Sequence, residues 1–316
     1  MNSKINVAII GKNFGYKVIF KVINKVKSFN VIAFCFKNKS NINFDKNIKI
    51  YDNWKKLLKN RKINAVIITS PPKTHFNIIK ESIKRNIHIF CEKPVTISLS
   101  QISQICKLIK KKKNIKHFVN FEFPRICAFE FFKKKISKNI KINKISVDWF
   151  IQIPHQNRPS WKNDHKKGGG IFFNYICHSL YYLEDLFGKF LLIKSLKNSS
   201  NYNAIFQNQN KNFKIQLNLK ILSSNSKKNP IHKIKIFSNK GIFYLESKTK
   251  SLRNEFILRK SKKVLFKPKV STEDFRLEPT LKNLKNFEKN IINNELTKPN
   301  FFDAKRVHQL INKLNS

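Results

Sequence analysis

Residues 5–15 read INVAIIGKNFG, a mostly apolar run that passes directly into a turn containing two glycines. The run predicts a short buried strand, and apolar residues recur at helical spacing after it, at Val18, Ile19, Val22, Ile23 and Val26. Glycine is used where φ must be positive or where a ligand approaches the backbone closely. A strand, a glycine turn and a helix in this order predict a site at which backbone N–H groups hold a pyrophosphate.

The glycine turn matches the dinucleotide pattern G-x-G-x-x-G only in part. That pattern would place glycines at positions 13 and 16, where the sequence has Asn13 and Tyr16. Asparagine adopts left-handed backbone conformations more readily than other non-glycine residues, so Asn13 can substitute for the missing glycine. We therefore expect a cofactor to contact Gly11, Asn13, Phe14 and Gly15. The alternative is an ordinary strand–helix turn.

Strands and helices alternate through the first third of the chain. The further elements expected there are strands at 31–36, 65–68, 87–91 and 117–121 and helices over 73–85 and 99–109. Near-continuous apolar strands that alternate with helices are typical of a parallel sheet covered on both faces. We predict an α/β, Rossmann-type, doubly wound dinucleotide-binding domain over residues 1–122.

The pattern changes in the remainder of the chain, which we assign to a second domain over residues 123–316. Segments such as 213–219 and 233–237 alternate polar and apolar residues, which predicts an α+β domain built on an open, mostly antiparallel sheet. A helix is expected over 172–187. Two more helices close the chain; the last is expected to be capped by Asp303 and is able to pack back on the first domain.

The end of the second strand bears on which dinucleotide would bind. An NAD site commonly has Asp or Glu there to bind the ribose 2′-OH. Residues 35–40 read CFKNKS, with two lysines and no acid, and a 2′-phosphate suits this sequence better than a free hydroxyl. The sequence therefore favours NADP over NAD, with Lys37 and Asn38 as candidate contacts.

The chain is strongly basic: its 316 residues include 65 Lys+Arg against 18 Asp+Glu, a formal charge of +47. Eight of the basic residues are Arg and 57 are Lys, and the lysines are spread among many Asn, Ile and Phe, the residues of AT-rich codons. Because base and phosphate recognition favours Arg, nucleic acid is not expected as the main partner. A hydrophobic content of 41% excludes a disordered chain.

Several classes of protein are excluded or disfavoured by simpler features. Five scattered cysteines without a C-x-x-C pair argue against a disulfide framework and a zinc ribbon, and favour a reducing, cytoplasmic location. No apolar run approaches the roughly 18 residues of a membrane helix, and no signal peptide is expected. The eight histidines show no metal-ligand spacing, so no metal is expected.

Three further motifs take the argument beyond the fold: SPPKTH at 70–75, CEKP at 91–94 and GGGIFFNYICH at 168–178. Together with VNFEF at 119–123 and the helix that begins at Asp303, they resemble the Gfo/Idh/MocA family (glucose–fructose oxidoreductase, inositol dehydrogenase and relatives). The resemblance covers nearly the whole chain. It implies a first domain that holds a nicotinamide cofactor and a second whose open sheet shapes the substrate cleft and often serves as an oligomer surface.

The resemblance also implies roles for individual residues. The lysine of E-K-P, Lys93 here, is near the nicotinamide and catalytic in that family, and the histidine after the three glycines corresponds to His178. Family members commonly have Asp and Gly at positions occupied here by Asn174 and Ile176. The further residues that the resemblance places at the cofactor are Ser70, Pro71, His75, Glu92 and Trp161. As alternatives, His75 only caps its helix, His178 is a hydrogen-bonded core histidine, and Trp161 is a packed residue of a loop.

The chemistry of alcohol oxidation gives these roles a physical basis. Removing a hydride from carbon and a proton from oxygen needs a base within reach of the hydroxyl. His178 titrates near neutral pH and can carry that proton, and Lys93 can polarise the oxygen or assist the transfer. Asn174 can orient a hydroxyl but cannot act as a base. We expect a homo-oligomeric NAD(P)-dependent oxidoreductase acting on a sugar, a sugar nucleotide or a cyclitol.

Two other functions remain open. The departures at Asn174 and Ile176 are compatible with a cofactor-binding sensor or scaffold without turnover. The charge of +47 is compatible with a nucleic-acid binder built on this fold, whose affinity would fall steeply with salt.

Overall fold

The computed structural model describes residues 4–37, 47–152, 161–198, 201–222, 230–247, 256–269 and 273–315. The chain divides into two compact units. The first comprises Met1–Glu122, Trp161–Cys177 and Arg276–Gln309, and the second comprises Phe123–Ser160, His178–Phe275 and Leu310–Ser316. Two segments that follow residue 122 in sequence therefore belong to the first unit.

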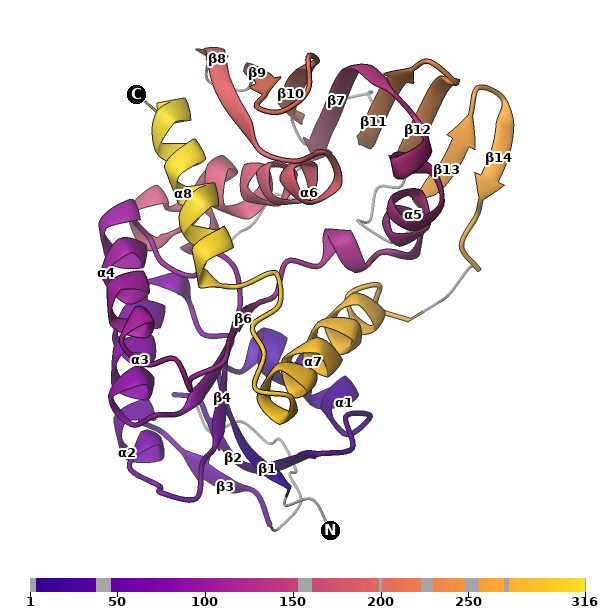
Figure 1. Ribbon diagram of the computed structural model, residues 1–316. Helices are drawn as coiled ribbons and strands as arrows, with labels where there is room; N and C mark the ends of the chain where they lie inside the picture. Colours follow the sequence, from indigo (N-terminus) through magenta and orange to yellow (C-terminus); the bar gives the residue numbers. More distant parts are fainter. Residues whose placement is uncertain are drawn as a thin grey trace. The chain divides into compact units, whose positions relative to one another are not determined.

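The first unit is built on a six-stranded parallel sheet in the order β3-β2-β1-β4-β5-β6 (Figure 1). Its strands are β1 (Ile5–Ile10), β2 (Phe29–Cys35), β3 (Lys49–Tyr51), β4 (Ala65–Ile68), β5 (His88–Cys91) and β6 (His117–Val119). All four residues of β4 are fully buried, as expected of a central strand covered on both faces. The predicted Rossmann-type sheet is confirmed.

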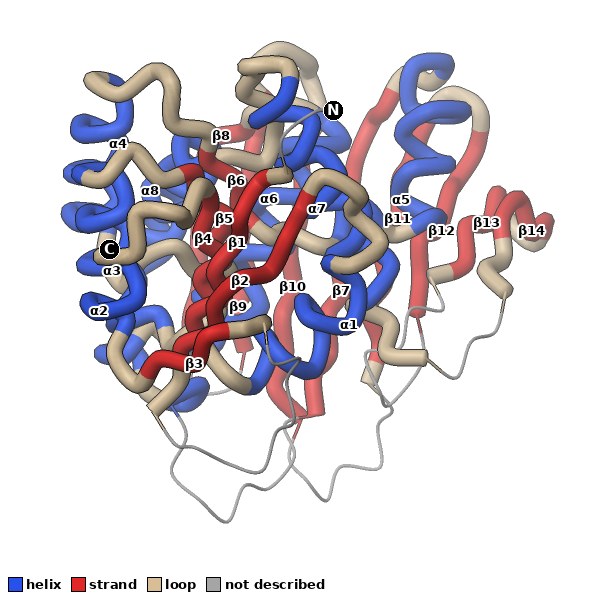
Figure 2. Tube along the Cα trace, turned by 90° about the horizontal axis from the view of Figure 1, so that it is seen from below, coloured by secondary structure: helices blue, strands red, loops and turns tan. Residues whose placement is uncertain are grey.

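Helices cover both faces of this sheet (Figures 1 and 2). One face carries α2 (Trp54–Leu58), α3 (Pro72–Lys84) and α4 (Leu99–Lys110). The other carries a π-helical stretch, Gly15–Ile19, that continues into α1 (Phe20–Ile23), together with the late helix α7 (Leu277–Ile292). The ring of Phe287 on α7 lies 6.0 Å from that of Phe29 and 5.7 Å from that of Phe90, centroid to centroid. These aromatic contacts anchor α7 in the first unit.

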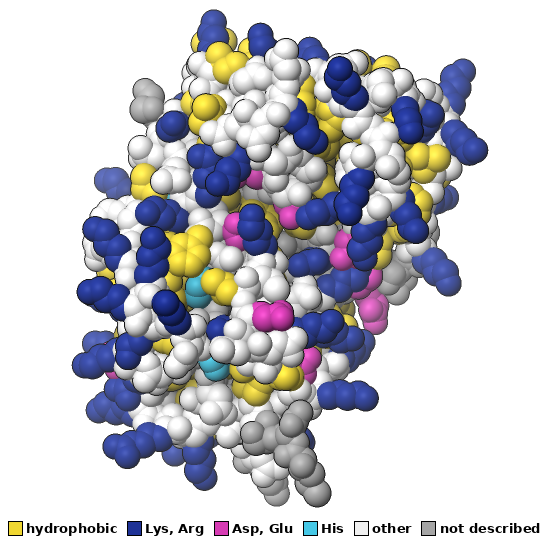
Figure 3. Space-filling view, viewed as in Figure 1, with side chains coloured by type: hydrophobic (Ala, Val, Ile, Leu, Met, Phe, Trp, Pro, Cys, Tyr) yellow, Lys and Arg dark blue, Asp and Glu magenta, His cyan; other side chains and the backbone are white. Residues whose placement is uncertain are grey.

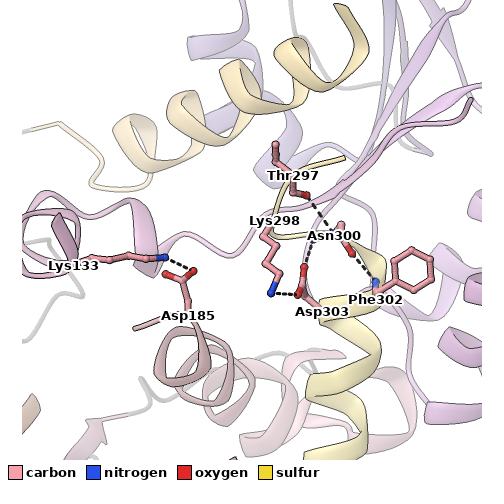
Figure 4. Close-up of polar contacts among 7 residues, drawn as sticks. All are labelled: Lys133, Asp185, Thr297, Lys298, Asn300, Phe302 and Asp303. Carbon is pink, nitrogen blue, oxygen red and sulfur yellow. Dashed lines mark hydrogen bonds and ion pairs between the residues drawn. The ribbon is translucent and has the colours of Figure 1, made fainter. Parts of the chain in front are cut away.

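The last helix, α8 (Phe301–Asn315), begins two residues before the predicted cap (Figure 4). Asn300 Oδ1 accepts a hydrogen bond from Phe302 N at 2.9 Å, and Asp303 Oδ2 accepts one from Asn300 N at 2.9 Å. This reciprocal pair is a capping box, in which the residue before the helix caps it and the acid three residues later reaches back. The expectation that Asp303 itself occupies the cap position is therefore wrong.

The second unit is built on an eight-stranded sheet in the order β14-β13-β12-β11-β7-β10-β9-β8. Its neighbouring strands are antiparallel except β7 and β10, which run parallel, so the predicted mostly antiparallel sheet is confirmed. The strands are β7 (Ile142–Gln152), β8 (Phe190–Lys197), β9 (Asn201–Asn208), β10 (Lys214–Leu222), β11 (Ile231–Ser238), β12 (Gly241–Ser247), β13 (Ile257–Lys260) and β14 (Lys263–Phe266).

One face of the second sheet is apolar and carries two helices, α5 (Cys127–Phe131) and α6 (Cys177–Phe187) (Figure 1). Along β10, Ile215, Leu217 and Leu219 are buried, while Gln216 and Asn218 between them are partly exposed. This alternation places one side of the strand against the core. Lys133, just after α5, donates to Asp185 Oδ1 of α6 at 2.7 Å and ties the two helical segments together (Figure 4).

Lysine and arginine side chains are scattered over the face of the molecule seen in Figure 3 and do not form a single patch there. Within the described ranges, no helix is both long and apolar enough to span a membrane. Among the same residues, no three His, Cys, Asp or Glu side chains are grouped as metal ligands.

Candidate active site

The glycine turn lies at the carboxyl end of β1 and is packed against the turn that follows β4. Gly11 has φ +118°, and its N–H donates to Cys35 O at 2.9 Å. A Cβ on Gly11 would lie 2.5 Å from Ser70 N, and one on Gly15 would lie 2.8 Å from Thr69 Oγ1. Neither position therefore has room for a side chain. Since β1 and β4 flank the point where the strand order reverses, this is where such sheets bind ligands.

Two other residues of the turn differ in conformation and surroundings from what the pattern suggested. Asn13 is exposed and already lies in the first helical turn, without positive φ, so the left-handed conformation predicted for it is wrong. Gly11 alone makes the sharp turn, which leaves residue 13 free to be helical. Phe14 is partly buried, and the guanidinium of Arg276, at the start of α7, lies 5.4 Å from its ring centroid.

Thr69 joins the two turns and was not identified from the sequence. Its Oγ1 donates to Ile10 O at 3.0 Å and lies 3.2 Å from Gly11 O. The next residue, Ser70, has its Oγ 2.7 Å from Thr74 Oγ1, and Pro71 then leads into α3. A threonine directly after a buried strand was the only available signal. The turn at 69–71 is thus held against the glycine turn by hydrogen bonds as well as by packing.

His75 is a buried residue that contacts two turns at this carboxyl edge of the sheet. Its ring is completely buried, with Nε2 2.6 Å from Ser70 O and Nδ1 3.0 Å from Pro94 O. Burial lowers its pKa to about 4, although the backbone carbonyls act in the opposite sense. His75 therefore connects the Ser70 turn to the turn that carries Lys93.

Lys93 follows β5 at the carboxyl edge and contacts the segment that contains the second glycine cluster. Its Nζ donates to Asn174 O at 3.0 Å, and Asn174 Nδ2 donates to Lys162 O at 2.5 Å. Gly169 lies so close to the backbone of Trp161 and Lys162 that a Cβ would not fit. The first unit thus brings together Lys93, Asn174 and Trp161, although Asn174 meets Lys93 through its backbone carbonyl and not through its amide.

The charges at this edge perturb one another. Burial, followed by the like charges of Lys93 and Arg276, lowers the pKa of Lys162. Burial and the charge of Glu122 raise the pKa of Glu92 to about 8, in spite of a hydrogen bond from Asn120. Lys162 and Glu92, whose pKa values are both shifted, therefore lie close enough to Lys93 to interact with its charge. Such perturbed groups are frequent at functional sites.

His178 lies in the second unit, in the first turn of α6, directly after the π-helical stretch Phe172–Ile176. It is 6% exposed, and its ring centroid lies 4.9 Å from that of Phe123. The same aromatic cluster contains His232, which stacks on Trp149 at 4.0 Å and has its Nε2 2.8 Å from the hydroxyl of Tyr182. Burial lowers the pKa of His232 to about 3. Sequence reasoning did not identify this second histidine, because it lies in a strand of ordinary alternation.

One candidate cofactor contact, Lys37, and one acidic residue, Asp52, lie near the end of β2. Lys37 is exposed just beyond β2, while Asn38 lies outside the described residues. Asp52 follows the neighbouring strand β3, where Tyr51 O accepts a hydrogen bond from Phe36 N at 3.1 Å. The charge of Asp52 contributes, after burial, to raising the pKa of Cys35. An acid therefore does lie near the end of β2, but it comes from the adjacent strand, which is why residues 35–40 did not reveal it.

A parallel sheet in this strand order, with a glycine turn at its reversal point, is the architecture of a Rossmann-type dinucleotide-binding domain. Residues 5–121 match the NAD-binding Rossmann fold of the oxidoreductase family, and residues 133–266 match that family's C-terminal alpha/beta domain. The chain belongs to the Gfo/Idh/MocA family of oxidoreductases.

Individual relatives are distant. An uncharacterized oxidoreductase from Synechocystis is 27% identical over 197 residues, which is 58% of this chain and 52% of the relative. Myo-inositol 2-dehydrogenase from Thermotoga maritima is 25% identical over 138 residues, 41% and 38% of the two chains. The matches thus span about half, or less, of these curated relatives. Levoglucosan dehydrogenase in complex with NADH shares the fold, with a TM-score of 0.82 at 15% identity over 99% of this chain and 97% of that one.

Proposed function

We propose that the protein transfers a hydride between a nicotinamide dinucleotide and a secondary alcohol of a sugar, a sugar nucleotide or a cyclitol. The observation that carries the proposal is the position of Lys93, at the carboxyl end of β5, with its ammonium 3.0 Å from Asn174 O. Ligands of such sheets bind at that edge. The family membership and the names of the sugar and inositol dehydrogenases among its relatives support the substrate class.

The residues of the glycine turn suit a dinucleotide. Gly11 and Gly15 let the glycine turn pack closely against the Thr69–Ser70 turn. Because Gly11 N–H donates to Cys35 O, a pyrophosphate would be held by the backbone N–H groups that follow Gly11 at the start of the helix. When bound, the nicotinamide supplies the hydride acceptor or donor. Lys93 would then hold the reacting oxygen through its ammonium, and His178 would take or return the hydroxyl proton. Asn174 Oδ1 is available to orient a substrate hydroxyl, because the amide nitrogen donates to Lys162 O.

Paired variants test the two proton-handling residues. Lys93→Met and His178→Gln are each expected to lower turnover about 100-fold or more, the usual range for removing a general acid or base. Lys80→Met, on the exposed side of α3, and His232→Gln, in the same aromatic cluster as His178, serve as matched controls. Reduction of NAD and NADP would be followed with a panel of sugars, sugar nucleotides and cyclitols. Equal losses in the test and control variants would contradict the assignment.

We further propose that Lys37 selects NADP over NAD and that Asp52 opposes it. A lysine favours the 2′-phosphate, whereas an acid favours the free ribose hydroxyl. Lys37→Ala is expected to weaken NADPH binding more than NADH binding, and Asp52→Asn to do the reverse. Binding should be titrated at low salt and again at several hundred millimolar salt, because the lysine excess attracts any phosphate. Binding that disappears with salt for both cofactors would rule out a dinucleotide site.

A second candidate is a cofactor-binding protein without turnover. It is favoured by the amide at position 174, where the family commonly has an acid, and by its hydrogen bond to Lys162 O. Reduced cofactor formed with any alcohol of the panel would exclude it.

We also propose that two copies pair through the second sheet. Its edge strand β8 exposes Leu191 by 43%, Ile193 by 55% and Leu196 by 61%, and an exposed apolar edge strand is prone to pair. Ile193→Lys with Leu196→Lys should convert a dimer in sedimentation into a monomer, and a wild-type monomer would refute the pairing.

A further inference from the structure

A chain of hydrogen-bonded polar groups, most of them buried, begins at Glu92, the residue before Lys93. Glu92 Oε1 accepts a hydrogen bond from Asn120 Nδ2 at 2.6 Å, and the same nitrogen donates to Thr280 Oγ1 at 3.3 Å. Thr280 Oγ1 in turn donates to Glu122 Oε1 at 3.1 Å. Asn120 and Thr280 have no exposed surface. The ends of β5 and β6 and the helix α7 thus contribute to one network that contains two carboxyl groups.

Each hydrogen bond of this network has a definite donor and a definite acceptor. Both N–H bonds of Asn120 Nδ2 are occupied, and Asn120 Oδ1 accepts from Asn283 Nδ2 at 2.9 Å. Asn283, also fully buried, has its Nδ2 3.3 Å from Phe121 O as well. Each carboxyl group therefore receives a hydrogen bond from a donor that has no other choice. Two carboxylates in so enclosed a place repel each other unless one is protonated.

We propose that Glu92 and Glu122 hold one proton between them at neutral pH and that this single negative charge, fixed by Asn120, Thr280 and Asn283, positions Lys93. The catalytic consequence rests on the function proposed above, whereas the shared proton does not. Glu92 immediately precedes Lys93, so its side chain anchors the turn that carries the ammonium. A second negative charge at this place would draw the ammonium away from Asn174 O.

Other charged and titratable groups lie near Glu92 and Glu122, and each favours or disfavours the charged form of its neighbour. Lys93 favours the ionised form of Glu92, while the charge of Glu122 disfavours it. The thiol of Cys91 is buried, and the charge of Glu92 helps to keep it protonated. Lys162 is repelled by the charges of both Lys93 and Arg276. Lys93 therefore lies between the negative charge at Glu92 and at least one other cation, Lys162.

The shared proton makes a direct prediction for unfolding. Unfolded Glu92 has its ordinary pKa of 4.5, whereas in the folded protein the pKa is about 8. The folded state therefore keeps a proton that the unfolded state releases, and stability is lost as the pH rises from about 5 to about 8. Burial, the larger cause of the shift, remains in Glu122→Gln, whereas the charge of Glu122 is removed. The unfolding equilibrium constant of the wild type should therefore rise more steeply with pH in this window than that of Glu122→Gln, by at most about tenfold per pH unit. The amide oxygen that this substitution introduces can still accept from Thr280.

Urea unfolding of both proteins between pH 5 and pH 9 measures this difference, with Glu81→Gln as the control. Glu81 is a carboxyl group on α3 paired with Arg85, outside the network. We expect the free energy of unfolding of Glu81→Gln to depend on pH as that of the wild type does, and that of Glu122→Gln to depend on pH differently. Should Glu122→Gln not fold, infrared difference spectra of the wild type between pH 6 and pH 9 should show a protonated carboxyl band that disappears near pH 8. Parallel unfolding curves, or no such band, would overturn the proposal.

The link to Lys93 is tested with Thr280→Ser and Thr280→Val. The serine variant keeps the hydroxyl, and its pH–rate profile should match that of the wild type. The valine variant loses it, and the alkaline limb of its turnover profile should shift while the cofactor affinity does not. Identical profiles for the two variants would refute a positioning role. If the proton is found but no substrate is ever turned over, the proposed function fails and the shared proton stands.

Discussion

Replacing His117 by asparagine tests whether buried, neutral histidines make this fold sensitive to acid. His117 is 2% exposed; its Nδ1 accepts a hydrogen bond from Phe301 N at 3.1 Å, and its ring stacks on that of Phe301 at 4.7 Å. Burial, aided by the charge of Lys116, lowers its pKa from 6.5 to about 3. Asparagine retains an acceptor near the place of Nδ1 but cannot take up a proton.

The magnitude follows from proton linkage. Between pH 6.5 and pH 3 the unfolded chain binds a proton at residue 117 that the folded chain does not, so stability is complete above about pH 6.5 and is lost on acidification. Integration from pH 7 to pH 5 gives a loss of about 2 kcal/mol for this residue. His232 and His308 are buried in the same way, with pKa values of about 3 and about 4. The three together account for about 6 kcal/mol, against a typical total stability of about 5–15 kcal/mol.

Urea unfolding of the wild type and of His117→Asn at pH 7 and pH 5 is the assay. At pH 7 the variant should be less stable by about 1 kcal/mol, because the ring contact with Phe301 is lost. At pH 5 this difference should change by about 2 kcal/mol in favour of the variant. Equal pH dependence of the two proteins would refute the reasoning, since it would mean that His117 is protonated in the folded state or does not titrate in the unfolded chain.

Three further substitutions, together with one control, test the glycine turn, the core and the cap of α8. Gly11→Ala should abolish cofactor binding and destabilise by more than about 2 kcal/mol, whereas Gly241→Ala, which has φ +99° but only an ordinary contact for its Cβ, should lose about 1 kcal/mol in chemical unfolding and bind cofactor normally. Tyr182→Phe leaves the buried Nε2 of His232 without the hydroxyl 2.8 Å away and should destabilise by about 2 kcal/mol, which urea unfolding would measure. Asn300→Ala removes the cap of α8 and should lower the free energy of unfolding by about 1 kcal/mol; no change would mean that Asp303 alone is sufficient.

Five of the six strands of the first unit could be predicted because each is largely a continuous apolar run, whereas the short strand β3 and the helix α2 that follows it were not predicted. The predicted strand at 65–68 has the same bounds as β4, for example. The return of α7 to this sheet could not be predicted in the same way. Phe287 finds Phe29 and Phe90 only in three dimensions, at separations along the chain that no local pattern reports.

The candidate site was predicted where its residues form short motifs and missed where they come from distant elements. The E-K-P motif led directly to Lys93. By contrast, Thr280 and Asn283 are polar residues on a helix and, in the sequence alone, are indistinguishable from solvent-facing positions. Both are fully buried, because Asn120 and Glu122 lie opposite them. Asp52 was missed for a similar reason, since its proximity to β2 depends on the pairing of β3.

Among 57 lysines, burial and hydrogen bonding alone would not identify Lys93. Lys116 is only 6% exposed, and its Nζ donates to Lys113 O at 3.3 Å and to Asn294 O at 3.1 Å, so it is held by carbonyls at least as firmly. The two lysines differ in which end of a strand they occupy. Lys116 precedes β6 and lies at the amino edge of the parallel sheet, whereas Lys93 follows β5 at the carboxyl edge, where the strand order directs a ligand. The buried Lys116 at the first edge stabilises the fold, whereas the partly buried Lys93 at the second edge is the one that we propose acts on a substrate.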